Sequence, residues 1–164
     1  MNEKFYSHST AIIENPNNIG EGTKIWVNVQ IRENVKIGSN CILSKDVYID
    51  QNVTIGNNCK IQNGVSIYQG VSIMDDVFVG PEVSFINDKV PRAFNTQWKT
   101  SPTLIKKGAS IGANSTILCG INIGEYAMVA AGSIVTKNVE PFTLVLGSPA
   151  KYLYKIDKMG NKVE

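Results

Sequence analysis

The sequence predicts an all-β solenoid, in which the chain winds into stacked coils of short strands. The first indication is an apolar side chain at every sixth residue through the first half of the chain. The second is a row of mostly small or β-branched residues two positions before each of these, and the third is the glycine, asparagine and aspartate between the rows. A period of six fits neither an α-helix, with about 3.6 residues per turn, nor a simple strand, with a period of about two. It fits a chain that runs straight briefly, turns and repeats.

The two rows run together without a gap as far as Phe85. The apolar row consists of Ile13, Ile19, Ile25, Ile31, Ile37, Leu43, Ile49, Ile55, Ile61, Ile67, Ile73, Val79 and Phe85. The preceding row consists of Ala11, Asn17, Thr23, Val29, Val35, Cys41, Val47, Val53, Cys59, Val65, Val71, Val77 and Val83. The turns hold Gly20, Gly22, Gly38, Asn40, Asn52, Gly56, Asn58, Gly70 and Gly80. Stacked coils would bury both rows in one continuous interior and pair each backbone with the next.

The register breaks after Phe85 and resumes at Ile105, shifted by two residues. The later apolar row is Ile105, Ile111, Ile117, Ile123, Val129 and Val135, and the later small row is Thr103, Ala109, Ser115, Ile121, Ala127 and Ser133. Residues 86–102 are therefore expected to leave the coils as one long excursion loop. A long loop in an otherwise regular solenoid usually carries function rather than packing.

The composition excludes several classes of protein. With 164 residues, 43% hydrophobic and 18% charged, the chain is long enough to bury a core and too apolar for a disordered protein. A formal net charge of +2 is too balanced for a dedicated nucleic-acid binder. No apolar run reaches the roughly 18 residues of a membrane span, and the first residues lack the features of a signal peptide. We therefore expect a cytoplasmic protein without a nucleic-acid or membrane partner.

The single histidine and the three cysteines limit the possible chemistry further. A three-histidine zinc site, as in a carbonic-anhydrase-like enzyme, cannot be built from His8 alone, so no metal is expected. Cys41, Cys59 and Cys119 leave an odd thiol and no C-x-x-C pair, which is typical of reduced cysteines.

The two ends of the chain differ from the repeat. We expect residues 1–10 to form an N-terminal cap and residues 11–147 to form the solenoid domain. Ser148 can cap a helix and Pro149 can occupy its first position. Residues 148–164 are therefore expected to form a short C-terminal helix and a tail.

The hexad pattern over roughly residues 8–155 resembles the hexapeptide-repeat acyltransferases, which fold as a left-handed parallel β-helix. In that fold three hexads make one triangular coil, so equivalent residues stack at a spacing of 18 and the hexads predict about six coils. The resemblance also implies a homotrimer with sites at subunit interfaces, in which one chain lends its loop to the next chain's coenzyme groove.

Two segments near the C-terminus, residues 130–137 and 147–151, look like the part of these enzymes that binds acetyl-CoA. The resemblance places five residues at coenzyme-contact positions, namely Ala113, Ala131, Thr136, Lys137 and Lys151. The physical basis is that small residues 18 apart, Ala113, Ala131 and Pro149, would let extended pantetheine lie against the backbone. The two lysines would then meet phosphates, and backbone amides near Gly112 would stabilise the oxyanion. The alternative is that the alanines only fit tight corners and the lysines are solvated.

The start of the loop resembles the nucleotide-sugar N-acetyltransferases that act on 3-amino sugars, through Phe85, Asn87, Pro91 and Arg92. We expect Asn87 to orient the acceptor amine, and Asp88 to attract its ammonium form and help to remove a proton. Alternatively, Asn87 forms an Asx turn that starts the loop.

Other acceptor contacts are expected around this loop. Arg92 would meet a pyrophosphate or pair with a loop carboxylate. The adjoining segment 61–68 also looks like the sugar N-acetyltransferases, and it offers the outward side chains of Gln62, Asn63 and Tyr68.

Val90 stands where many hexapeptide O-acetyltransferases carry a catalytic histidine. A hydroxyl nucleophile needs such a base, whereas an amine with a pKa of about 8 already has a neutral fraction at physiological pH. We therefore expect an acetyl-CoA-dependent N-acetyltransferase acting on a nucleotide-linked amino sugar, with a dTDP-3-amino-3,6-dideoxyhexose as the expected acceptor. A sugar or polysaccharide O-acetyltransferase and a non-catalytic β-helix scaffold are the alternatives, and the choice between dTDP and UDP stays open.

Overall fold

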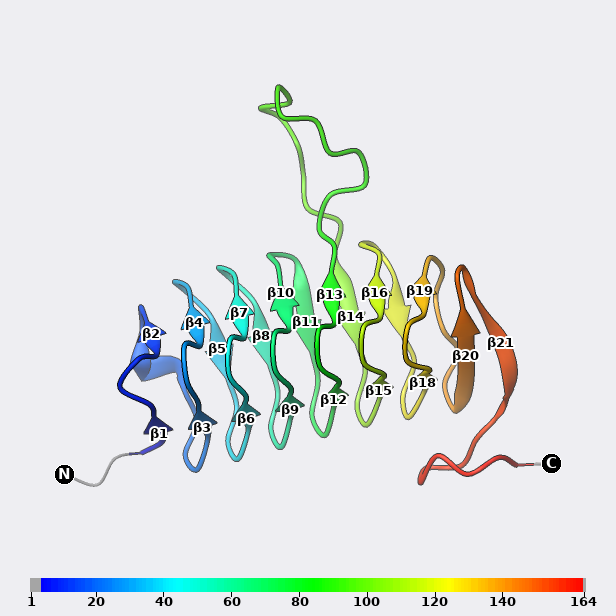
Figure 1. Ribbon diagram of the computed structural model, residues 1–164, viewed down its shortest axis with the longest axis horizontal. Coiled ribbons are helices and arrows are strands. Elements are labelled where there is room, and N and C mark those ends of the chain that lie inside the picture. Colours follow the sequence, from blue (N-terminus) through cyan, green and yellow to red (C-terminus); the bar gives the residue numbers. More distant parts are fainter. Residues whose placement is uncertain (1–3, 164) are drawn as a thin grey trace.

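The computed structural model describes residues 4–163, which form one β-solenoid of about eight coils (Figure 1). Three sheets run along its length, and every strand pair in them is parallel except the last pair of the first sheet. The predicted all-β solenoid is therefore confirmed. We call the turns between the sheets the 1–2, 2–3 and 3–1 corners, in the order in which the chain meets them.

Each coil contributes one short strand to each sheet wherever it is complete. The first sheet contains β1 (Tyr6–Ser7), β3 (Lys24–Ile25), β6 (Ile42–Leu43), β9 (Lys60–Ile61), β12 (Phe78–Val79), β15 (Ser110–Ile111), β18 (Met128–Val129), β20 (Thr143–Gly147) and β21 (Ala150–Lys155). The second contains β2 (Ile12–Ile13), β4 (Gln30–Ile31), β7 (Tyr48–Ile49), β10 (Ser66–Ile67), β13 (Ser84–Phe85), β16 (Thr116–Ile117) and β19 (Ile134–Val135). The third contains β5 (Lys36–Ile37), β8 (Thr54–Ile55), β11 (Val71–Ile73), β14 (Thr103–Ile105) and β17 (Asn122–Ile123).

Both residue rows point into the shared interior. Ile55, Ile61 and Ile67, from three different sheets, are 4%, 0% and 0% exposed and belong to one core cluster. The turns explain the asparagines, because Asn28, Asn34 and their equivalents adopt left-handed backbone with φ of 56° and 58°. Asparagine and glycine enter that conformation at lower cost than other residues.

The predicted number of about six coils is wrong, because the solenoid continues beyond both rows. At the N-terminal end Tyr6 pairs with Lys24, although the hexad row begins only at Ile13. At the other end Val129 pairs with Val145, a spacing of 16 residues instead of 18. The last coil is therefore not part of the hexad pattern from which the number of coils was predicted. Residues 1–3 of the expected N-terminal cap, and Glu164 of the expected tail, lie outside the described residues.

The predicted C-terminal helix is also wrong. Residues 150–155 form strand β21, which runs antiparallel to β20, and Ser148 and Pro149 form the turn between the two strands. The last coil leaves the backbone N–H and C=O groups along the outer edge of β20 unpaired. Pairing with β21 satisfies these groups, whereas an isolated short helix would leave them exposed to water. Within residues 4–163 the one helical element is the 3-10 turn η1 (Pro16–Asn18).

The excursion loop of residues 86–102 leaves the solenoid at the 2–3 corner, between the end of β13 and the start of β14, and projects away from the coils (Figure 1). The coils close around it without a break, because Val71 in β11 pairs with Thr103 in β14, 32 residues later.

Candidate functional site

A groove of about 340 Å³ lies over β12, β15 and β18 of the first sheet. It is lined by Phe78, Ser110, Ile111, Gly112, Met128, Val129, Ala130 and Ala131. At this 1–2 corner the coils pack so closely that a side chain on Gly112 would collide with the backbone nitrogen of Ala131. Small residues, Gly112, Ala130 and Ala131, line the groove at this corner, so an extended ligand can approach the backbone there.

The edge of small residues is shorter than expected. The N–H of Gly132 donates to the carbonyl oxygen of Ala113 at 2.8 Å, so Ala113 and Ala131 lie on neighbouring coils as predicted from their spacing. Pro149 does not continue this edge. The 16-residue register between β18 and β20 brings Gly147 to the matching place, and Pro149 lies in the turn before β21.

The predicted phosphate-binding lysines line a different cavity. Lys137 and Lys151 border a space of about 320 Å³ at the C-terminal end of the solenoid, together with residues such as Val139 and Tyr152. Thr136 directly follows β19 and is exposed. The structure therefore places Gly112 and Ala131 at the groove and Lys137 and Lys151 at this end cavity, while Ala113 and Thr136 line neither space.

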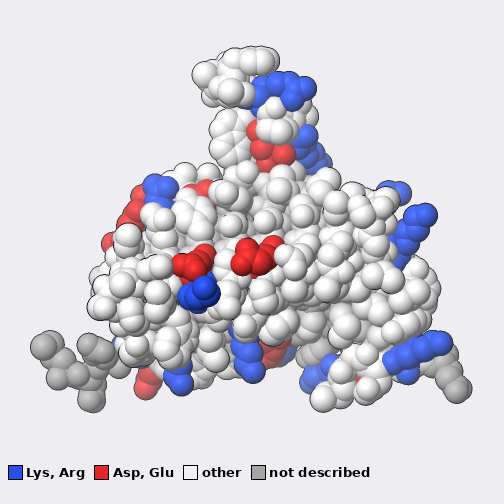
Figure 2. Space-filling model, viewed as in Figure 1, with Lys and Arg blue, Asp and Glu red and all other residues white. Residues whose placement is uncertain are grey.

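Positive charge is concentrated in the coils that follow the loop. The coils after the loop, residues 103–163, carry seven lysines and three carboxylate side chains, whereas residues 4–85 carry six basic and eight acidic side chains. Figure 2 shows lysines at the C-terminal end with little acidic surface beside them. This end of the molecule is the one that favours an anionic ligand.

The predicted acceptor residues at the loop meet at the 2–3 corner. Asn87 is half-buried and follows Gln69 by 18 residues, so it stands on the next coil at the place where the loop begins. The Oδ1 atom of Asp88 accepts a hydrogen bond from the N–H of Val90 at 2.8 Å, so Asp88 forms a turn at the start of the loop. Its Oδ2 atom takes no part in this bond. Arg92 is exposed and donates to the carbonyl oxygen of Pro91 at 2.7 Å.

Gln62 and Asn63 lie at a different corner of the solenoid from the loop. They follow β9 at the 1–2 corner, where the N–H of Glu82 donates to the carbonyl oxygen of Asn63 at 2.9 Å. Tyr68 follows β10 at the 2–3 corner and packs on Tyr48, with ring centroids 5.7 Å apart. The predicted acceptor residues are thus split between two corners, with the second sheet between them.

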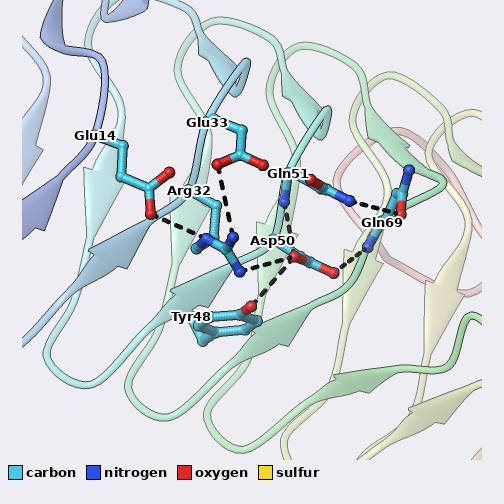
Figure 3. A network of polar contacts seen from close by, with 7 residues as sticks. All are labelled: Glu14, Arg32, Glu33, Tyr48, Asp50, Gln51 and Gln69. Atoms are coloured by element: carbon cyan, nitrogen blue, oxygen red, sulfur yellow. Dashed lines mark hydrogen bonds and ion pairs between the residues drawn. The ribbon is translucent and has the colours of Figure 1, made fainter.

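A polar network below the loop was missed in the sequence (Figure 3). Asp50 is its centre, because its carboxylate accepts from the hydroxyl of Tyr48 at 3.2 Å and from the N–H groups of Gln51 at 2.9 Å and Gln69 at 3.2 Å. Arg32 approaches the same carboxylate at 3.9 Å. The signal that could have revealed it is the stacking distance, since Arg32 and Asp50 are 18 residues apart.

Arg32 is bound more strongly to other carboxylates. Its Nε lies 3.0 Å from Glu14 and its Nη2 lies 3.6 Å from Glu33. Interaction with Tyr48 and these carboxylates raises the pKa of Arg32 above its ordinary value. Because its charge is neutralised within the network, Arg32 serves the corner and is not a free anion-binding group.

Two further observations bear on the site. Within residues 4–163, no cluster of three or more histidine, cysteine, aspartate or glutamate side chains has an arrangement that could hold a metal ion. Over the same range, no helix has the length and apolar character needed to cross a membrane.

Family models and known proteins agree with this architecture. Residues 18–51 and 52–87 match the model described as bacterial transferase hexapeptide (six repeats), and residues 102–137 match the hexapeptide repeat of succinyl-transferase. The dTDP-3-amino-3,6-dideoxy-alpha-D-galactopyranose 3-N-acetyltransferase of Aneurinibacillus thermoaerophilus is 50% identical over 149 residues, which cover 91% of this chain and 77% of that protein.

Two solved structures are similar in fold. A hexapeptide-repeat acetyltransferase of Vibrio cholerae complexed with acetyl coenzyme A has a TM-score of 0.59 and 27% identity, over 70% of each chain. AntD, an N-acyltransferase of Bacillus cereus solved with dTDP-4-amino-4,6-dideoxyglucose and coenzyme A, has a TM-score of 0.64 and 23% identity, over 94% of this chain and 81% of that one. The repeat, the coils and the identity along most of both sequences place this chain in the hexapeptide-repeat acyltransferase family.

Proposed function

We propose that this protein is an acetyl-CoA-dependent N-acetyltransferase that acts on the amino group of a dTDP-linked 3-amino-3,6-dideoxyhexose. The observation that carries the proposal is the 50% identity to a 3-N-acetyltransferase for such a sugar, over 91% of this chain. The loop supports it independently, since Val90 replaces a base that hydroxyl acceptors need and amine acceptors do not.

Acetyl-CoA is proposed to lie in the groove along Gly112, Ala113 and Ala131. The small residues at this corner would let pantetheine approach backbone amides and carbonyls. The phosphates would extend toward the end cavity, where Lys137 and Lys151 supply positive charge beside Thr136. The acetyl-CoA complex of the Vibrio cholerae relative supports this class of ligand.

In the proposed reaction the neutral amine attacks the thioester carbonyl, the C–N bond forms and the C–S bond breaks. Asn87 orients the amine, and the free oxygen of Asp88 attracts its ammonium form before the proton is lost. A backbone amide near Gly112 stabilises the oxyanion, and the departing CoA thiolate accepts the proton. The proposed acceleration comes mainly from positioning and electrostatics, and no metal ion takes part.

A second copy of the chain is proposed to complete each site. The loop leaves at the 2–3 corner, whereas the groove opens on the first sheet beside the 1–2 corner. In a homotrimer the loop of one subunit would reach the groove of the next, where Gln62 and Asn63 lie on the groove's side and Arg92 arrives with the loop. This assembly, the left-handed winding and the cytoplasmic location are proposed by analogy with the family.

The test is thiol release from acetyl-CoA with a panel of dTDP- and UDP-linked amino sugars. We expect turnover with a dTDP-3-amino-3,6-dideoxyhexose and a product that resists mild base, as an amide does. A base-labile product would instead indicate O-acetylation. Tight acetyl-CoA binding without turnover of any acceptor would support a non-catalytic scaffold.

Asn87→Ala is the matched variant for this assay. We expect turnover to fall by about 100-fold, the lower range of effects for a positioned catalytic group, while acetyl-CoA binding and assembly are unchanged. Unchanged turnover would remove Asn87 from the mechanism.

A further inference from the structure

We propose that Gly70 and Gly120 are positioning residues that hold the excursion loop in its working orientation. The proposal rests on the proposed function, because it assumes that the loop presents Asn87 to the acceptor. It concerns the loop base, which we define as residues 87–89 on the outgoing side and residues 100–102 on the returning side.

The two glycines occupy a column at the 2–3 corner that holds asparagine in two earlier coils and Pro102 in the coil of the loop. The third sheet aligns Lys36, Thr54, Ser72 and Asn122. The residues two positions before them are Asn34, Asn52, Gly70 and Gly120. All four have left-handed backbone, with φ of 58°, 62°, 95° and 77°. Since asparagine serves this place in the earlier coils, the left-handed turn alone does not account for glycine on both sides of the loop.

The missing side chains make room for the loop base. A Cβ on Gly70 would lie 3.2 Å from the Cβ of Thr100, on the returning side. A Cβ on Gly120 would lie 3.2 Å from Nζ of Lys89, on the outgoing side, and 3.3 Å from the Cβ of Ser101. The loop base is therefore held between the coil below and the coil above, in the volume that two asparagine side chains would otherwise fill.

Hydrogen bonds join the same two glycines to Thr103, the first residue of β14, which directly follows the loop base. The N–H of Thr103 donates to the carbonyl oxygen of Gly70 at 3.0 Å, and the N–H of Gly120 donates to Oγ1 of Thr103 at 3.1 Å. Beyond the loop base, residues 90–99 are exposed, and Phe94 reaches 83% exposure. The direction of the loop is therefore set mainly at its base, and a displacement there moves Asn87.

The experiment compares Gly70→Asn and Gly120→Asn with Gly22→Asn. Gly22 has a similar φ of 73° but lies at the 3–1 corner of an early coil, where a side chain would meet the flexible amide of Asn40. All three variants place asparagine in a left-handed turn, so the control removes the effect of the substitution itself. Trypsin reports the loop directly, because Lys89, Arg92 and Lys99 are exposed cleavage sites within it.

We expect Gly70→Asn and Gly120→Asn to be cut in the loop at least about fivefold faster than Gly22→Asn, while the Kd for acetyl-CoA stays within about twofold. Their kcat/KM for the amino sugar should fall by about tenfold to 100-fold, because a displacement near 1 Å costs that much. Unchanged cleavage would overturn the proposal, and so would faster cleavage with unchanged acceptor kinetics. If the unaltered protein turned over no amine, the proposed function would fail, while the cleavage rates would still decide whether the glycines hold the loop.

Discussion

Asp50 accepts a hydrogen bond through Oδ2 from the backbone N–H of Gln69 at 3.2 Å, and this bond ties together two neighbouring coils. The other oxygen of Asp50 accepts the N–H of Gln51, so one carboxylate satisfies a backbone donor on each coil. Gln69 stands directly before Asn87 in the column that leads to the loop. The corner from which the loop departs is therefore braced by a side chain from two coils below it.

Asp50→Ala should destabilise the protein because it leaves two backbone N–H groups without this acceptor. Asp50 is only 17% exposed, and the expected loss is about 1–3 kcal/mol in the free energy of unfolding. Asp50→Asn keeps an acceptor oxygen, so its free energy of unfolding should fall by less. Urea unfolding at one fixed protein concentration measures both variants, and equal stability of Asp50→Ala and the unaltered protein would contradict the bracing role.

Asp88→Asn separates the charge of Asp88 from its turn. The amide oxygen can still accept the N–H of Val90, so the loop should resist trypsin as before. Loss of the charge should lower kcat/KM for the amino sugar by about tenfold, since a positioned charge contributes at least that much to proton transfer. Asp88→Ala, which loses both features, should also be cleaved faster. Full activity in Asp88→Asn would exclude the carboxylate from the mechanism.

Phe85→Ala should destabilise the coil from which the loop departs. Phe85 is fully buried and pairs with Ile67 and Ile117 on the neighbouring coils. Truncation of such a residue costs about 3–5 kcal/mol through lost burial and the cavity left behind. Phe85→Leu should cost clearly less. Thermal unfolding ranks the two variants, and equal midpoints would show that the coil closes around the gap.

The three thiols should be unreactive in the folded protein. Cys41 and Cys59 are fully buried and Cys119 is 2% exposed. The thiol of Cys41 donates to the carbonyl oxygen of Gly56 and that of Cys59 to the carbonyl oxygen of Met74, both at 3.1 Å, so both sulfurs are enclosed by their own coils. Dithiobis-nitrobenzoate should therefore detect three thiols per chain only after denaturation. Rapid reaction of the native protein would show that the coils open.

Asp157 should make the C-terminal turn sensitive to acid. Its carboxylate accepts the N–H groups of Met159 and Asn161, both at 2.8 Å, and the side chain of Asn161 at 3.1 Å. These hydrogen bonds lower the pKa of Asp157, and the bond from the Asn161 side chain has the largest effect. The ionised form is thus favoured in the fold, so the turn is fully stabilised above the unfolded pKa of about 3.9 and loosens as the pH falls through the lowered value. The amide resonance of Asn161 should follow that titration, and Asp157→Asn should abolish it.

The regular part of the fold could be predicted because burial in the interior requires an apolar residue at every sixth position. The positions of Ile61, Ile67 and Phe85 are dictated by the interior, and the loop is visible as the gap between two rows in different registers. The sequence of the C-terminal strand shows no such periodic pattern. Tyr152 and Leu153 are exposed, so β21 depends on its pairing with β20 and not on an apolar pattern.

The site could be predicted only as a set of residues, and not as an arrangement. Ala113 and Ala131 lie on neighbouring coils as their spacing of 18 suggested, whereas Pro149 does not continue that edge. Gln62 and Asn87 belong to different corners, however, because a prism has three sides and a hexad pattern does not say which corner faces the loop. Bonds such as that between Asp50 and Gln69 join residues 19 positions apart and appear only when the coils are stacked.

The antiparallel strand β21 also determines how the solenoid ends. A growing stack of coils would offer a parallel edge to the first coil of another molecule, and repetition of that contact would build a fibre. The longest sheet ends instead in a strand of opposite direction, with Lys151 and Lys155 along it. The reversal blocks head-to-tail polymerisation through this sheet and leaves the lateral faces for association.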